Sequence, residues 1–354
     1  MMTLQQRKDA FVQLGQGLRA LAHHDEWPGY SSALTREEFE GLRELLDTAR
    51  ARNGWFTPGS VKQALAAWGD NLSTDKLGTW LSAYDLPGTN RAPATVALIC
   101  AGNIPLVGFH DLLSVLITGN KALVKLSTDD DLLIPAVIRL LMRIEPGFAG
   151  SVNYASGVLQ DFDAVIATGS TNTARYFREY FGAWPHIIRH GRTSVAILTG
   201  DESAEELAGL GHDIFDYFGL GCRSVSKIYV PEKYDLNTFF GGIYPFHNVI
   251  NHNKYANNYD YNKAVWLLNQ EELLDNGFIL LKEEHRLASP TASLYYSRYN
   301  DRSELDQQLD QASASVQCVV ARNRVPFGQA QAPGLADYAD GADTIDFLLT
   351  IRKT

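Results

Sequence analysis

The chain has 354 residues, of which 45 % are hydrophobic and 20 % charged, and its formal net charge is −10. This length supports a substantial core and predicts two domains, or one α/β domain with an appendage. The negative charge argues against a nucleic-acid or anionic-membrane partner, and no apolar run reaches the roughly 20 residues that span a bilayer. The first ten residues lack the apolar core of a secretory signal. Three cysteines, at 100, 222 and 318, match neither a disulfide framework nor a clustered zinc site. We therefore expect a cytoplasmic protein without a bound metal.

The first 90 residues are expected to be helical. Apolar residues recur at helical spacing from Phe11 to Leu21 and from Phe39 to Leu46. Thr35 stands where an N-cap is expected. The Pro/Gly-rich segment 87–93 is the clearest break in the chain and predicts a domain boundary.

From residue 94 the pattern changes to short apolar runs that alternate with amphipathic segments. This alternation predicts a parallel sheet with crossover helices. The expected strands are 94–101, 121–126, 162–168 and 194–199, and the expected helices are 106–118, 132–144, 173–181 and 203–210.

Beyond residue 222 the pattern is less regular. The Asn/His/Tyr-rich stretch 247–262 is most simply a long polar loop, with a substrate-contacting lid as the alternative. Elsewhere we expect strands at 226–230, 292–297 and 315–321 and helices near 235–242, 259–274 and 303–313.

Three loops follow predicted strands, at the edge where open α/β sheets bind ligands. Asn103 has a side-chain amide that can donate to an oxyanion, or it is an ordinary turn residue. Lys125 and Ser127 can reach a ribose or a phosphate, or the lysine is simply solvated. Gly169 stands at a turn, and Ser170 or Thr171 caps the next helix, whose N-terminus suits a pyrophosphate, or the residue is a plain cap. Neither G-x-G-x-x-G nor a P-loop motif is present.

Cys222 follows Gly219 and Gly221 at the exit of a helix-like segment, and Arg223 comes directly after it. Glycines at such an exit allow backbone angles that a Cβ hinders, and they let a substrate approach closely. An exposed thiol beside a cation favours the reactive thiolate. The alternative is a small buried hydrophobic residue.

In chain order these motifs resemble the aldehyde dehydrogenase superfamily, and within it the LuxC-like fatty acyl-CoA reductases. The resemblance runs from about Ala94 to the C-terminus. Its landmarks are N-I-P-L at 103–106, G-N-K-A-L-V-K-L-S at 119–127, G-S-T at 169–171, G-L-G-C at 219–222, and P-F-G-Q-A-Q-A-P-G-L-A-D-Y-A-D-G-A-D-T-I-D-F-L-L at 326–349.

The resemblance implies an α/β, aldehyde-dehydrogenase-like fold. A Rossmann-type parallel-sheet domain is combined with a second α/β catalytic domain and a helical N-terminal segment. The implied boundaries are 1–90 for the helical segment, 91–205 for the nucleotide-binding domain, 206–325 for the catalytic domain, and 326–354 for a C-terminal segment packing back on the body.

The resemblance also implies a reaction. Cys222 takes the acyl group of a fatty acyl-CoA, or another acyl thioester, and NADPH (NADH in the alternative) reduces it to the aldehyde. Asn103 and the Cys222 backbone N–H would stabilise the oxyanion, and His190 is a candidate base. The implied cofactor-binding residues are Lys125, Ser127, Gly169, Ser170, Glu283 and Glu284.

The sequence departs from the superfamily pattern in three places. Arg189 or His190 falls where aldehyde dehydrogenases carry the glutamate that activates water, which disfavours hydrolysis of an acyl-enzyme. The nicotinamide-ribose motif is blurred around Glu283 and Glu284. The chain is also shorter than a typical member, so a homo-oligomer is left open. Two other functions stay open: oxidation of an aldehyde to the acid, and a non-catalytic nucleotide-binding scaffold in a lipid pathway.

Overall fold

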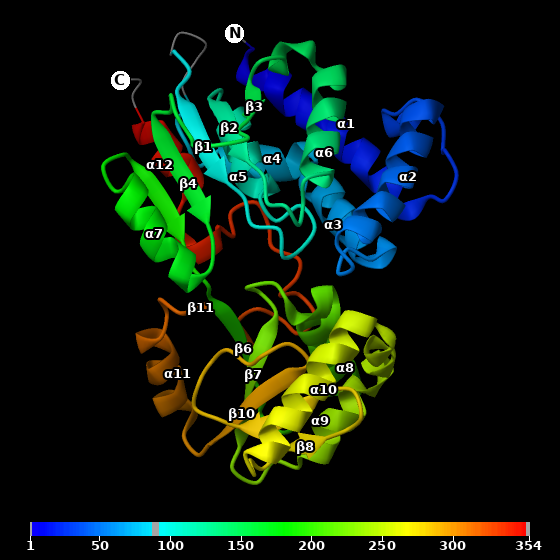
Figure 1. Cartoon of the computed structure of the whole chain (residues 1–354), viewed down its shortest axis with the longest axis vertical. Helices are drawn as coiled ribbons and strands as arrows, with labels where there is room; N and C mark the ends of the chain where they lie inside the picture. The colour runs from blue at the N-terminus through cyan, green and yellow to red at the C-terminus, as the bar shows by residue number, and fades with distance from the viewer. Residues whose placement is uncertain (1, 87–91, 352–354) are drawn as a thin grey trace. The chain divides into compact units, whose positions relative to one another are not determined.

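The computed structural model describes residues 2–86 and 92–351 and divides the chain into two compact units (Figure 1). The first unit comprises Met1–His190 and Gly334–Thr354, and the second comprises Gly191–Pro333. This division precedes the boundary predicted at residue 205, because strand β6 (Thr193–Ile197) pairs with β7 and β11 of the second unit. Of the predicted C-terminal segment, 326–333 belongs to the second unit and the remainder to the first.

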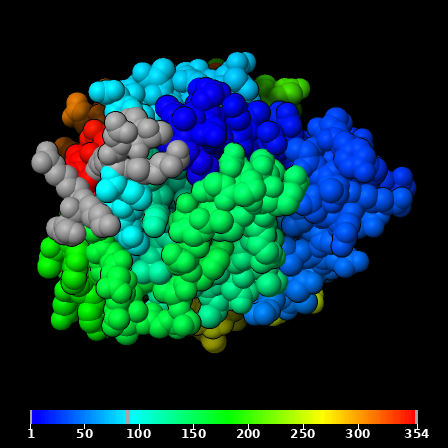
Figure 2. Space-filling model, turned by 90° about the horizontal axis from the view of Figure 1, so that it is seen from above, coloured from blue at the N-terminus to red at the C-terminus, as the bar shows by residue number. Residues whose placement is uncertain are grey.

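The N-terminal segment is helical, as the sequence predicts. Capping boxes start the first two helices: Thr3 pairs with Gln6, and Thr35 pairs with Glu38. Helix α1 packs on α3 and α6, and Figure 2 shows this blue segment beside the green residues that follow β2. Residues 87–91 of the predicted boundary lie outside the described residues. The helices are α1 (Leu4–His23), α2 (Arg36–Arg52), α3 (Pro58–Asn71) and α4 (Thr74–Leu81), with a 3-10 turn η1 (Tyr30–Ser32).

Within the described ranges, the first sheet has five parallel strands in the order β3-β2-β1-β4-β5. The chain leaves β1 toward β2 on one side and reaches β4 on the other, so the strand order reverses between β1 and β4. The strands are β1 (Thr95–Ile99), β2 (Lys121–Lys125), β3 (Val152–Tyr154), β4 (Ala164–Thr168) and β5 (His186–Arg189). The helices of this region are α5 (Phe109–Ile117), α6 (Leu133–Ile144), α7 (Thr171–Phe181) and α12 (Thr344–Thr350), with 3-10 turns η2 (Pro146–Phe148) and η5 (Ala339–Gly341).

Both faces of this sheet are buried. Val96 and Leu98 join the large core formed with the N-terminal helices. Ala97 between them points to the opposite face, where it packs with Val165 and with Phe177 of α7. Successive strand residues point to opposite faces, so a strand buried on both sides must be apolar throughout. This explains the continuous apolar run by which β1 was predicted.

The second sheet has six strands among the described residues, in the order β11-β6-β7-β10-β9-β8. All pairs are parallel except β8 with β9. In Figure 1, helix α11 lies on one side of the strands and α8, α9 and α10 lie on the other. Besides β6, the strands are β7 (Val225–Pro231), β8 (Leu274–Asp275), β9 (Leu280–Glu283), β10 (Ser293–Tyr299) and β11 (Val316–Val320). The helices are α8 (Ala204–Phe215), α9 (Leu236–Ile243), α10 (Asn253–Leu268) and α11 (Arg302–Gln311), with 3-10 turns η3 (Asp216–Gly219) and η4 (Tyr244–Asn251).

The structure corrects the predicted polar loop at 247–262. This stretch forms the end of η4 and most of α10. The buried face of α10 consists of Tyr255, Tyr259, Asn262 and Trp266, whose rings and amide are not strongly apolar, so no amphipathic pattern appeared in the sequence. In the described ranges, no helix is both long and apolar enough to cross a bilayer.

Candidate active site

A strained turn leads into the loop that carries Cys222. Tyr217 and Phe218 have φ angles of 53° and 58°, and Gly219 follows with φ 73°. Residues other than glycine rarely adopt these left-handed angles, which cost on the order of 1–3 kcal/mol each. Tyr217 is buried, and the Phe218 ring lies 4.3 Å from the His252 ring. Packing of the two aromatic side chains therefore holds the turn.

The side chain of Cys222 is exposed, whereas Cys100 is half-buried and Cys318 is buried. Burial raises the pKa of Cys100 to about 12, which makes its thiol a poor nucleophile. The carbonyl oxygen of Cys222 accepts a hydrogen bond from Ser194 Oγ at 3.0 Å. Ser194 is fully buried on β6 and also lies 3.1 Å from the Cys318 sulfur. The main chain of Cys222 is thus tied to the neighbouring strand while its side chain is exposed.

Two contacts hold the residues after Cys222. Arg223 Nε donates to the carbonyl oxygen of Ala330, and Ser224 Oγ accepts from Gln331 at 3.1 Å. The arginine expected to flank the thiolate therefore also binds main chain. These contacts give the terminal P-F-G-Q-A-Q motif a location beside the Cys222 loop.

Asn103 and Ser127 follow the carboxyl ends of the adjacent strands β1 and β2, and their loops touch. Asn103 is exposed. A Cβ on Gly102 would lie 2.6 Å from Ser127 Oγ, so only glycine fits between the loops. Lys125 ends β2 with an exposed side chain whose Nζ lies 3.3 Å from the Gly157 carbonyl oxygen.

Gly169 and Ser170 follow β4, the strand on the other side of β1. Ser170 is the N-cap of α7, and its Oγ accepts the Thr173 N–H at 3.2 Å. All these first-unit candidates except His190 occupy the carboxyl edge of one sheet at its strand-order reversal, where α/β folds bind nucleotides. An exposed lysine, hydroxyls and a helix N-terminus form a donor set that fits the anionic phosphates of a nicotinamide dinucleotide.

Arg189 is the last residue of β5, and His190 follows it. Arg189 is only 3 % exposed and forms an ion pair with Asp111 of α5. It also donates to Thr344 Oγ1 at 2.9 Å, which ties the C-terminal segment to the first unit. Arg189 therefore has a structural role. His190 is half-buried and is the last residue of the Met1–His190 part of the first unit.

Glu283 ends β9, and its side chain is exposed. The strand register places it level with Ile228 of β7, with β10 between them. Glu284 pairs with Arg286 at 2.7 Å, and this pair lowers the pKa of Glu284 to about 2. Of the two candidates, Glu283 has the more available carboxylate.

The sequence reasoning missed Lys227. Its side chain is 1 % exposed, and Nζ donates to the carbonyl oxygens of Glu284 and His285 at 2.6 and 3.1 Å. Burial lowers its pKa to about 8. A lysine within an apolar strand pattern, five residues after Cys222, was the available signal. Asp213 of α8 was also missed.

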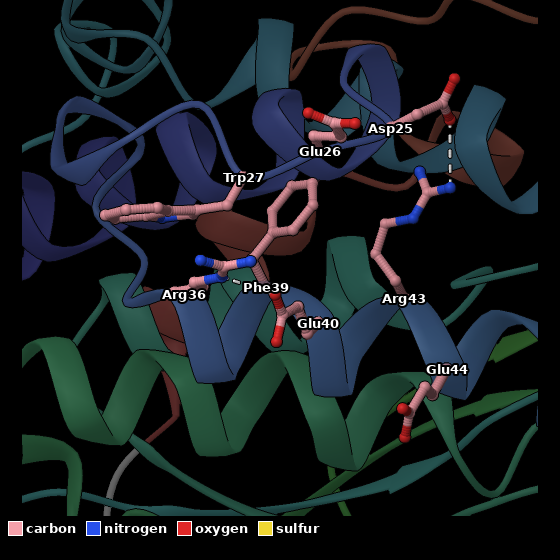
Figure 3. Close-up of a pocket in the computed structure, with 8 residues that line it drawn as sticks. All are labelled: Asp25, Glu26, Trp27, Arg36, Phe39, Glu40, Arg43 and Glu44. Carbon is pink, nitrogen blue, oxygen red and sulfur yellow. Dashed lines mark hydrogen bonds and ion pairs between the residues drawn. The ribbon is translucent and has the colours of Figure 1, made fainter.

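A cavity of about 570 Å³ lies in the N-terminal helical segment (Figure 3). Its charges largely pair with one another: Arg36 with Glu40 at 2.7 Å and Arg43 with Asp25 at 3.0 Å. None of the site residues predicted from sequence lines it. In the described part of the chain, no three His, Cys, Asp or Glu side chains form a group that could hold a metal ion.

Residues 73–239 match the family model described as acyl-CoA reductase (LuxC). Two curated relatives share this similarity. The long-chain acyl-protein thioester reductase of Photorhabdus laumondii is 24 % identical over 37 % of this chain and 30 % of its own length. That of Vibrio harveyi is 26 % identical over 39 % of this chain and 32 % of its own length. The chain thus matches about a third of the length of these relatives.

The fold has close counterparts among solved structures. Aldehyde dehydrogenase 21 from Physcomitrella patens, in complex with succinate, superposes with a TM-score of 0.62 at 13 % identity, covering 91 % of this chain and 74 % of that one. The Delta-pyrroline-5-carboxylate dehydrogenase of Mycobacterium tuberculosis bound with NAD gives 0.58 at 13 % identity, covering 96 % and 70 %. The protein therefore has the aldehyde dehydrogenase fold, and its residues 73–239 are similar to the acyl-CoA reductase (LuxC) family.

Proposed function

We propose that this protein reduces a long-chain acyl thioester to the aldehyde through an acyl group carried on Cys222. The observation that carries the proposal is the exposed Cys222 thiol, which follows a strained turn and has its main chain tied to β6. The similarity to long-chain acyl-protein thioester reductases supports this substrate class.

In the first half-reaction, the Cys222 thiolate attacks the thioester carbonyl carbon. The C–S bond to coenzyme A breaks, coenzyme A leaves as its thiolate, and the acyl group stays on Cys222. The two thioesters are nearly equal in energy, so the protein contributes alignment and a deprotonated sulfur. Asn103 and the backbone N–H of Cys222 are the proposed oxyanion donors, each worth roughly 10²–10³ in rate.

In the second half-reaction, a reduced nicotinamide, when bound, would supply a hydride for the acyl carbon on Cys222. Cys222 then leaves as the thiolate when the hemithioacetal collapses to the aldehyde. Lys125, Ser127, Gly169 and Ser170 are the proposed cofactor-binding residues, with Glu283 or Glu284 toward the ribose. We favour NADPH because Lys125 and Ser127 together suit a 2′-phosphate. His190 is the proposed base that takes the proton from the Cys222 thiol.

The residues at the end of β5 support reduction over hydrolysis. A carboxylate that activates water would release the acyl group as fatty acid. Here that region carries His190 and the buried Arg189, which is committed to Asp111. Because Arg189 offers no carboxylate to activate water there, hydrolysis of the acyl group is disfavoured relative to its reduction. The use of cysteine as a thiol also supports a reducing, cytoplasmic setting.

Incubation with a long-chain acyl-CoA tests the proposal. Wild-type protein is expected to gain one acyl mass in an intact-mass measurement, and Cys222→Ala is expected to gain none. Cys100→Ala and Cys318→Ala are the matched controls and should acylate like wild type. Addition of NADPH should then remove the adduct and yield aldehyde.

Two results would contradict the proposal. Wild-type protein that takes up no acyl mass would favour the non-catalytic scaffold. Conversion of aldehyde and NAD(P)⁺ to fatty acid in the absence of coenzyme A would favour aldehyde oxidation.

A further inference from the structure

Asp213 is a buried carboxylate that the proposed reaction does not use. It is 0 % exposed on α8. Its two oxygens accept the backbone N–H groups of Gly328 and Ala330 at 2.7 and 2.8 Å. Burial raises its pKa to about 6, so the group is ionised at pH 8. A buried charge is retained only where hydrogen bonds compensate it, and here both partners lie on one segment, 326–331.

The 326–331 segment is the same one that holds the residues after Cys222. Ala330 donates its N–H to Asp213 and accepts at its carbonyl oxygen from Arg223. The next residue, Gln331, donates to Ser224. One peptide segment thus links α8 to both residues that follow the nucleophile.

The packing leaves this segment little freedom. A Cβ on Gly209 of α8 would lie 3.0 Å from the Phe327 carbonyl carbon and 3.2 Å from the Gly328 nitrogen. Ala330 is 0 % exposed, and Gly328 has a φ of +80° that suits glycine. Backbone therefore lies directly against backbone, and a shift of the segment must move Arg223 and Ser224.

We infer that Asp213 is a positioning residue for Cys222. Asp213 fixes the 326–331 segment, and the segment in turn fixes Arg223 and Ser224. This assigns a role to the terminal P-F-G-Q-A-Q motif. The inference rests on the proposed role of Cys222 as nucleophile, but the tether itself can be measured without any acyl substrate.

The test variant is Asp213→Asn, measured at pH 8, where Asp213 is ionised. Asparagine keeps one acceptor oxygen. Its NH2 group replaces the other oxygen and faces a backbone N–H. Asp216→Asn is the matched control, because it removes the same charge near the same end of α8, where Asp216 contacts the His212 ring at 3.2 Å. Two quantities are measured. One is amide hydrogen exchange of a peptide covering 219–226, with a peptide covering β6 as internal reference. The other is the rate of Cys222 acylation by acyl-CoA.

In Asp213→Asn we expect faster exchange at 219–226 with an unchanged β6, and acylation slower by roughly tenfold or more, since small displacements of a nucleophile are costly. The direction of the change in acylation rate distinguishes positioning from electrostatics. Loss of a nearby negative charge favours the thiolate, so electrostatics alone would accelerate acylation. If the variant folds poorly, Gln331→Ala removes only the contact to Ser224 and should slow acylation by about threefold.

Unchanged exchange at 219–226 would overturn the inference, as would acylation in Asp213→Asn at or above the rate of Asp216→Asn. Failure of the proposed function looks different. In that case wild-type protein takes up no acyl group, while the exchange measurement still decides whether Asp213 holds the Cys222 loop.

Discussion

The two groups of candidate residues are held in different ways. In the first unit, Ser127 and Ser170 accept from N–H groups only two and three residues further along the chain. In the second unit, Arg223 binds a residue 107 positions away, and Asp213 binds one 115 positions away. The loops of Ser127 and Ser170, proposed to bind the cofactor, thus rest largely on local contacts, whereas the Cys222 loop depends on distant segments. We expect changes in the first unit to have small and confined effects, and changes in the second to spread.

Lys227→Met should give the largest loss of stability. Methionine fills a similar volume, but the carbonyl oxygen of His285 loses the Lys227 donor, and that of Glu284 keeps only Ser297 Oγ at 3.0 Å. Leaving an acceptor without its donor costs about 1–3 kcal/mol, so we expect a loss of about 2 kcal/mol in the free energy of unfolding, measured in urea. Lys263→Met, at the half-exposed pair with Asp275, is the control and should cost under about 1 kcal/mol. Equal losses in the two variants would argue against long-range dependence in the second unit.

The same lysine predicts a pH dependence. Burial lowers the pKa of Lys227 from 10.5 to about 8. Between these values the unfolded chain binds a proton that the folded chain does not, so the free energy of unfolding rises with pH in this window. Lys227→Met lacks this contribution, and the stability of wild type relative to the variant should therefore grow from pH 8 to pH 10. Parallel stability curves would mean that the buried amine does not titrate in this range.

Gly102→Ala tests the contact between the two cofactor loops. The new methyl group would push against Ser127, so we expect the Kd for NADPH to rise about tenfold. Acylation of Cys222 by acyl-CoA needs no cofactor, so it should slow less than NADPH binding weakens, and only through displacement of the adjacent Asn103, a proposed oxyanion donor. Gly157→Ala is the control, since nothing lies within 4 Å of a Cβ there. A loss of acylation as large as the loss of NADPH affinity would show that the first-unit loops are not independent.

Ser170→Ala should have the smallest effect. It removes the acceptor for the Thr173 N–H and should lower the free energy of unfolding by about 1 kcal/mol. Ser170→Thr, which keeps a capping hydroxyl, should restore most of it. A much larger loss would show that this cap supports more than the first turn of α7.

The sequence was most informative where structure is local. The apolar run of β1 and the cap at Ser170 fall at or within a few residues of their predicted places, since each depends on neighbours in the chain. The predicted helix from residue 106 begins at Phe109 instead, because Leu106 has a φ of 58°. Cys222 was recognised through its glycines and the order of motifs. Asp213 and Lys227 were not, because a buried charge is identified only by partners that the fold brings from elsewhere.

The left-handed turn ahead of Cys222 affects which part of the protein loses its native conformation first on heating. Tyr217 and Phe218 keep their φ angles only while their rings stay packed, and relaxation of the turn releases its stored strain. Separation of the strands of the second sheet releases no such strain. Warming should therefore slow acylation of Cys222 while the circular dichroism spectrum is still native, so a sample with intact secondary structure can already have lost the proposed reactivity.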